Sequence, residues 1–148
     1  MVRLTFLSHF CICLAVAAAA WFAYVNGVFA IVWANDQSHM TSAIGVLFIA
    51  TTIWLGWQAW LADTYFSITR GSVADASFGH LAERLSVMMG LAGTTIGLAL
   101  QSKALMSGAA SFGALSTSLY TTCVGILSAA LISIMVFSLE CGIKRARM

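Results

Sequence analysis

The side chains best placed to do chemistry are hydroxyls inside two apolar segments, Gly90–Gln101 and Ala114–Glu140. Neither segment contains an Asp, Glu, Lys, Arg or His side chain before Glu140, at the end of the second. Transport across a membrane usually depends on an acid, a base or a histidine within a span. A proton or ion path built by this chain alone would therefore have to use hydroxyls. The available set is Thr94, Thr95, Ser116, Thr117, Ser118, Thr121 and Thr122.

These hydroxyls also have a purely structural interpretation. Ser and Thr in membrane helices often bond back to the preceding turn or across to a neighbouring helix. The alternative is a polar stripe that lines a path between helices, which would need a partner to supply the titrating group. Both interpretations stay open at this point.

Small side chains share one face of each segment. In the second segment they recur at steps of four, three, four and four, which places them on one side of a helix opposite a bulky face. We expect such a small face to pack on another helix and the bulky face to meet lipid. The predicted packing residues are Gly90, Gly93, Gly97, Gly125 and Ala129.

No metal, cofactor or enzymatic site is expected. Cys11 and Cys13 are two residues apart, so on a helix they point in different directions and cannot jointly hold a metal. His80 has only Glu83 at ligand spacing. No nucleophile and base can be paired from the sequence, which argues against an enzyme.

The composition indicates a membrane protein. The 148 residues are 61% hydrophobic and 8% charged, and none is proline, whereas soluble domains carry roughly 25% charged residues. The length allows four spans of about 20 residues with short connections and no separate soluble domain. We therefore predict an all-α integral membrane protein that forms a single domain over residues 1–148.

Four membrane spans are predicted, at about 4–33, 43–62, 86–102 and 114–140. The first is interpreted as one long or tilted helix. A polar connection over 63–85 contains Asp75 as the expected N-cap of a helix that runs into the third span. Trp54, Trp57 and Trp60 indicate an aromatic belt at the membrane surface, with a tryptophan-lined ligand site as the alternative.

Charge distribution predicts the orientation. With both termini and the 63–85 connection on one side, that side holds six of the seven Lys and Arg residues, and Lys103 alone lies opposite. Cytoplasmic loops carry the excess of positive charge. We therefore expect a multi-pass protein of the inner (cytoplasmic) membrane with both ends in the cytoplasm.

Two motifs in order resemble a known family. GLAGTTIGL (90–98) and, after a short loop, ALSTSLYTTCVGI (114–126) are similar to the paired signature of the MotA/TolQ/ExbB proton-channel family. That signature is a Gly-Leu-Leu-Gly-Thr-Val-x-Gly helix followed by an Ala-Leu-x-x-Thr-x-x-Gly-Leu helix. The resemblance covers about a third of the chain, Leu85–Ser138. The matching residues are Gly90, Leu91, Gly93, Thr94, Gly97, Ala114, Leu115, Leu119, Thr122 and Gly125.

The resemblance implies a homo-pentamer around the single transmembrane helices of a second subunit. That partner carries the aspartate that takes up and releases protons, while Thr94 and Thr122 line the wall beside it. Ion flow then drives motion of one subunit set against the other. The sequence departs from the family at Thr117, where one branch has glutamate, at Leu131, where proline is common, and in its short 63–85 connection.

Other function classes fit less of the sequence. A structural or holin-like membrane oligomer, in which the Gly, Ser and Thr faces only pack, explains the lack of charge and needs no partner. A small four-helix exporter would need a membrane carboxylate in its first span, which this chain lacks. Nothing in the sequence indicates nucleic-acid binding, and the lipid bilayer is the expected environment.

Overall fold

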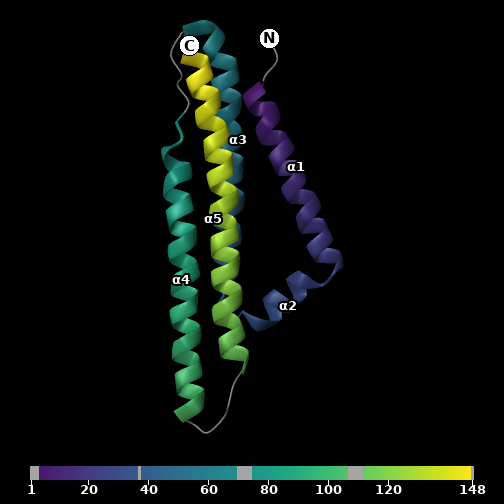
Figure 1. Cartoon of the computed structure of the whole chain (residues 1–148), viewed down its shortest axis with the longest axis vertical. Helices are drawn as coiled ribbons and strands as arrows, with labels where there is room; N and C mark the ends of the chain where they lie inside the picture. Colours follow the sequence, from purple (N-terminus) through teal and green to yellow (C-terminus); the bar gives the residue numbers. More distant parts are fainter. Residues whose placement is uncertain (1–3, 37, 70–74, 107–111, 148) are drawn as a thin grey trace.

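The protein is built from helices. The structure, a computed structural model, describes residues 4–36, 38–69, 75–106 and 112–147, and these contain no strand. The helices are α1 (Leu4–Val25), α2 (Val28–Asn35), α3 (Met40–Thr69), α4 (Ser77–Met106) and α5 (Phe112–Arg147) (Figure 1).

Four of these helices are long and apolar enough to cross a membrane. The stretches with that character are Thr5–Val25, Met40–Thr64, Ser77–Lys103 and Ser118–Lys144. The prediction of an all-α protein with four membrane helices is therefore confirmed, and the chain is a multi-pass membrane protein.

The first predicted span is not one helix, and this is a correction. The sequence predicted an unbroken helix over 4–33, but α1 ends at Val25 and α2 begins at Val28. Gly27 lies in the left-handed region with φ 72°, and its N–H bonds to the Tyr24 carbonyl at 3.0 Å. The Asn26 side chain donates to the Phe22 carbonyl at 2.7 Å. Asn-Gly therefore closes α1 although hydrophobic residues continue beyond it.

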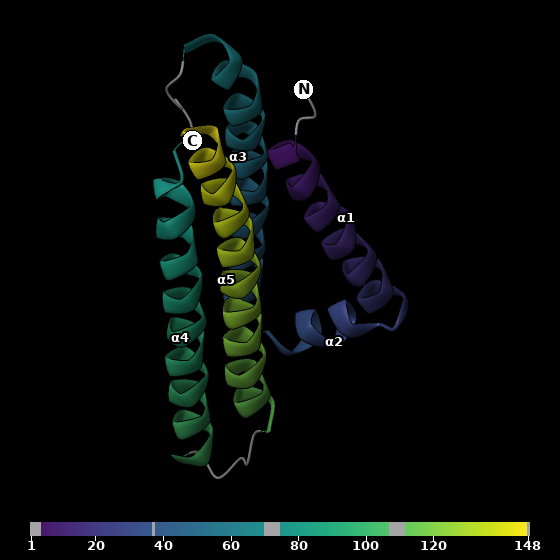
Figure 2. The same cartoon turned by 45° about the horizontal axis from the view of Figure 1, so that its top comes forward.

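Helices α3, α4 and α5 form a bundle, and α4 and α5 run antiparallel as a hairpin (Figure 1). Helix α5 contacts all four other helices. Only 6% of the apolar stretch of α1 is buried, against 39% for α5, and both views show α1 leaning away from the bundle (Figures 1 and 2). The core consists of Leu55, Ala59, Ala62, Ala82, Ile132, Met135, Val136 and Leu139.

The predicted 63–85 connection is largely helical. Helix α3 continues to Thr69 and α4 begins at Ser77, so the predicted third span extends backwards without a break. The Asp75 carboxylate accepts the Ser77 N–H at 2.9 Å and the Ser77 hydroxyl. These two bonds lower the pKa of Asp75 below its usual value.

Both chain ends lie at the same end of the molecule. The start of α1, the end of α5, the end of α3 and the start of α4 are gathered there (Figure 1). We call this the terminal end. The four-span path thus returns to the side where it began, and the cytoplasmic location of that side stays a prediction.

The opposite end is uneven. In both views the α4–α5 hairpin extends beyond the connection between α2 and α3 (Figures 1 and 2). Asp36 in that connection is 7% exposed and fixes the start of α3. Its carboxylate accepts the Ser38 N–H at 3.1 Å, the Ser38 hydroxyl at 2.7 Å and the Thr41 N–H at 2.8 Å.

Candidate functional site

The α4–α5 interface brings two of the predicted glycines into contact. A Cβ added to Gly125 would lie 2.8 Å from the Gly90 α-carbon and 2.8 Å from the Ser86 carbonyl oxygen. The neighbouring atoms are backbone, so no rotamer change can make room for a methyl group. Glycine at both positions is what allows the two backbones to approach this closely.

A third glycine, Gly93, leaves space for the side chain of Thr121. A Cβ added to Gly93 would lie 2.6 Å from Oγ1 of Thr121. Thr121 is fully buried, and its hydroxyl donates to the Ser118 carbonyl at 3.2 Å. The predicted packing residues Gly90, Gly93, Gly97, Gly125 and Ala129 are all buried.

At the next residue of each helix, Thr94 of α4 and Thr122 of α5 meet through their hydroxyl oxygens. Each hydroxyl also reaches a carbonyl of its own helix: Thr94 bonds to Gly90 at 3.0 Å and Thr122 to Ser118 at 2.7 Å. A hydroxyl has one hydrogen to donate, so two hydrogens serve three contacts. The threonine that donates its hydrogen to the other threonine therefore cannot also donate to the Gly90 or Ser118 carbonyl of its own helix.

The remaining predicted hydroxyls differ in their surroundings. Ser118 is 3% exposed, and its hydroxyl donates across the interface to the Thr94 carbonyl at 3.2 Å. Thr95 is exposed and bonds back to Ala92 at 2.8 Å. The Thr117 side chain lies outside the described residues. The structure thus gathers Thr94, Ser118, Thr121 and Thr122 at the interface between α4 and α5.

Sequence reasoning missed the buried hydroxyl of Ser86. Ser86 is fully buried one turn before Gly90 on α4, and its Oγ has no hydrogen-bond partner among the described residues. A buried polar group without a partner costs about 1–3 kcal/mol. Ser86 lies four residues before Gly90 and therefore on the same face of α4, and this spacing is the feature of the sequence that indicates its burial.

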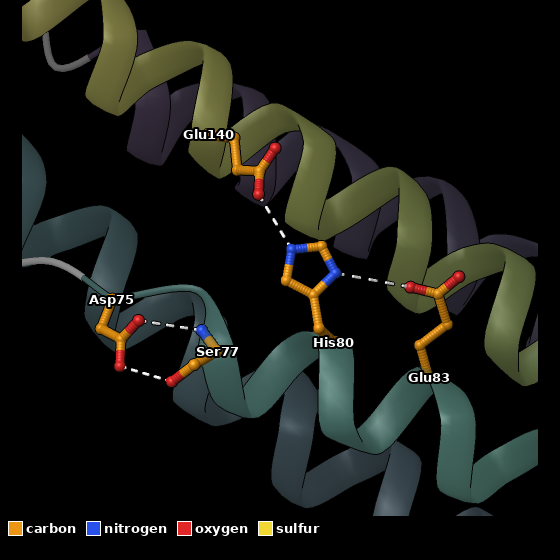
Figure 3. A network of polar contacts seen from close by, with 5 residues as sticks. All are labelled: Asp75, Ser77, His80, Glu83 and Glu140. Atoms are coloured by element: carbon orange, nitrogen blue, oxygen red, sulfur yellow. Dashed lines mark hydrogen bonds and ion pairs between the residues drawn. The ribbon is translucent and has the colours of Figure 1, made fainter.

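A second polar cluster lies at the terminal end of the bundle. Nε2 of His80 on α4 lies 2.9 Å from the Glu140 carboxylate on α5, and Nδ1 lies 3.8 Å from Glu83 (Figure 3). His80 was predicted to be a surface residue, and its side chain is 49% exposed. Its contact with Glu140 was not predicted.

A third set of contacts holds the N-terminal part of α1. The Phe6 N–H donates to the Asp63 carboxylate of α3 at 2.8 Å. The hydroxyls of Ser8 and Ser138 are 2.8 Å apart, which links α1 to α5. His9 of α1 is 6% exposed, and its ring contacts Thr52 of α3.

The predicted aromatic belt is partly exposed on α3. Trp54 packs edge-on against Phe78 of α4 at 5.6 Å between ring centroids, and Trp57 lies 5.3 Å from Trp60. In the part of the chain that the structure describes, no group of three or more His, Cys, Asp or Glu side chains is arranged to hold a metal ion.

Comparisons of this chain with protein-family models, curated proteins and solved structures found no match.

Proposed function

We propose that this protein is the channel-type subunit of an energised complex in the inner (cytoplasmic) membrane. In this proposal several copies, five by the sequence resemblance, surround the transmembrane helix of a second protein. That partner contributes an aspartate, and ion movement past it is coupled to motion of the two sets of subunits. The role is not enzymatic.

The observation that carries the proposal is the contact between Thr94 and Thr122. Both are half-buried, and they share two hydrogens among three contacts. A hydroxyl pair that can exchange its hydrogen-bond partner is suited to the wall of an ion path. The stretches 90–101 of α4 and 115–139 of α5, which contain this pair, have no Asp, Glu, Lys, Arg or His, so in this proposal the titrating group of the path comes from a partner.

The second candidate is a structural membrane oligomer without ion coupling. The observation that favours it is that Thr94, Thr95 and Thr122 all bond to carbonyls of their own helices. Helix packing alone requires no more than this. In that case the motifs at 90–98 and 114–126 would serve only to pack α4 against α5 through their glycines.

Native mass spectrometry of the detergent-purified complex, expressed with its neighbouring genes, separates the two candidates. We expect five copies with a small single-span protein that has an aspartate in its membrane segment. Proteoliposomes containing that complex should dissipate a pH gradient. A bare oligomer of another number, without a partner and without flux, would favour the structural role.

A further inference from the structure

His9 is a buried ionisable side chain within a candidate membrane helix. It is 6% exposed and lies in the apolar stretch Thr5–Val25 of α1. Ionisable residues inside membrane segments are costly and commonly mark ion or proton sites. The Thr94–Thr122 pair lies on α4 and α5, so His9 on α1 is separate from the proposed path.

The hydrogen bond of His9 fixes which ring nitrogen is free. Nε2 lies 3.2 Å from the carbonyl oxygen of Thr52 on α3. A carbonyl oxygen only accepts, so Nε2 carries the hydrogen of the neutral ring. In a neutral imidazole the other nitrogen is then an acceptor. Nδ1 is therefore the atom that can take up a proton.

Helix α3 is shaped to receive this ring. A Cβ added to Gly56 would lie 3.1 Å from Nε2 of His9 and 3.3 Å from its Cδ2. Gly56 lies one turn after Thr52, so the absence of a side chain exposes the Thr52 carbonyl to the ring. On the same helix, a Cβ added to Gly45 would meet nothing within 4 Å.

The acceptor nitrogen Nδ1 and the close packing of the ring against Gly56 together indicate a role for His9. We propose that His9 is a proton-binding site of the membrane domain and that its protonation releases α1 from α3 and α5. Protonation adds a positive charge to a ring packed between two apolar helices. Such a charge is unfavourable unless an anion or water accompanies it.

The charged groups around His9 do not supply that anion in the docked arrangement. Helix α1 packs against α2, α3 and α5. On α3 the Asp63 carboxylate is bonded to the start of α1, and on α5 Glu140 is paired with His80 while Lys144 is exposed. Helix α2 has no titratable side chain, and Cys13 is the titratable neighbour one turn along α1. Undocking is thus the way to bring the charged ring to water or lipid headgroups.

The part of α1 next to His9 borders a cleft. An open cleft of about 300 Å³ lies between α1 and α5. Its lining includes Thr5, Ser8 and Ser138 beside apolar residues such as Ile12 and Phe137, and Ser8 is the residue next to His9.

Disulfide cross-linking tests the release of α1. The Ser8→Cys/Ser138→Cys pair, in a chain with the four native cysteines changed to Ala, replaces the 2.8 Å hydroxyl contact with two thiols. We expect the cross-linked fraction to fall several-fold between about pH 8 and about pH 5, the range in which imidazole ordinarily titrates. The same chain with His9→Gln should not show this fall in the cross-linked fraction. Protonation of the two introduced thiols slows cross-linking equally in both chains, so it does not explain a difference between them. Equal pH profiles for the two chains would overturn the proposal.

Glycine variants test the geometry in the same assay. Gly56→Val should push the ring from the Thr52 carbonyl, lower cross-linking at both pH values and remove the response. Gly45→Val places the same side chain on α3 where space is open, and it should leave the response intact. A full pH response in the Gly56→Val chain would contradict the proposed site.

Nitrogen NMR of histidine-labelled protein in nanodiscs gives an independent test with the native cysteines present. The chain has three histidines, so His39→Gln and His80→Gln assign the His9 signals. We expect the hydrogen on Nε2 at about pH 8 and protonation of Nδ1 by about pH 5. A His9 ring that stays neutral over this range would overturn the proposal.

Discussion

Gly125 of α5 faces Gly90 of α4 so closely that a Cβ on Gly125 would lie 2.8 Å from the Gly90 α-carbon. Gly125→Ala should therefore force the two backbones apart. Overpacking of this kind typically costs about 1–3 kcal/mol, and we expect the free energy of unfolding in detergent to fall by that amount.

Gly45→Ala is the matched control for this prediction. It makes the same change in a membrane helix where the added Cβ has open space. Alanine favours a helix over glycine by roughly 0.5–1 kcal/mol, so this variant should be as stable as the native chain or more stable. Equal losses in both variants would show that the α4–α5 contact is not responsible.

Thr122→Val removes one hydroxyl of the Thr94–Thr122 pair and keeps the shape of the side chain. Thr94 can still donate to the Gly90 carbonyl, so no buried donor loses its partner. We expect the free energy of unfolding to change by less than about 1 kcal/mol and the oligomer to stay intact. Under the proposed function, proton flux in proteoliposomes should be abolished.

Thr95→Val provides the comparison, because Thr95 is exposed on α4 and bonds only back to Ala92 among the contacts described. Its flux should equal that of the native chain. Normal proton flux in the Thr122→Val variant would contradict the proposal that Thr122 lines the ion path.

Asp36→Asn should weaken the protein at neutral pH. Burial by itself raises the pKa of Asp36, but hydrogen bonds from Ser38 and Thr41 outweigh burial and hold the pKa below its usual value. An asparagine has one carbonyl oxygen and cannot replace both carboxylate oxygens. The loss of such a cap typically costs about 1 kcal/mol.

The pH dependence of that difference follows from the lowered pKa of Asp36. The ionised carboxylate contributes its full stability above the unfolded pKa of about 3.9, and this contribution is lost as the pH falls through the lower folded value. Thermal melting should separate the native chain from Asp36→Asn at pH 7, and the gap should shrink below about pH 4. A gap that grows on acidification would contradict this origin.

Asp63→Ala should loosen the start of α1. The Asp63 carboxylate accepts the Phe6 N–H, one of the N–H groups that a helix start leaves without an internal partner. We expect less cross-linking of the Ser8→Cys/Ser138→Cys pair at fixed neutral pH. Glu83→Ala removes a negative charge from the terminal end without touching α1, so cross-linking in that control should be unchanged.

The membrane helices could be predicted because their signal is local. A bilayer requires about 20 consecutive apolar residues, and that property is visible in each segment by itself. Asp75 at the start of α4 was predictable for the same reason, since its contacts are with Ser77, two residues away. The Asn26–Gly27 break was also local, but continued hydrophobicity up to Trp33 concealed it.

Contacts between distant segments could not be predicted. Asp63 and Phe6 are 57 residues apart, His80 and Glu140 are 60 apart, and Ser8 and Ser138 are 130 apart. Each contact depends on how two helices are rotated and shifted along one another, which periodicity within one helix does not determine. For the same reason the contact between His9 and the Thr52 carbonyl, 43 residues apart, could not be predicted.

Helix α5 contacts each of the other four described helices, yet of these five it is synthesised last. Leu55, Ala59 and Ala82 enter the membrane before Ile132 and Met135, the residues of α5 in the same core, have been translated. Lipid must cover those earlier surfaces in the interval. A nascent chain that stops before Phe112 has α3 and α4, which contact each other, but lacks the helix that covers both of them.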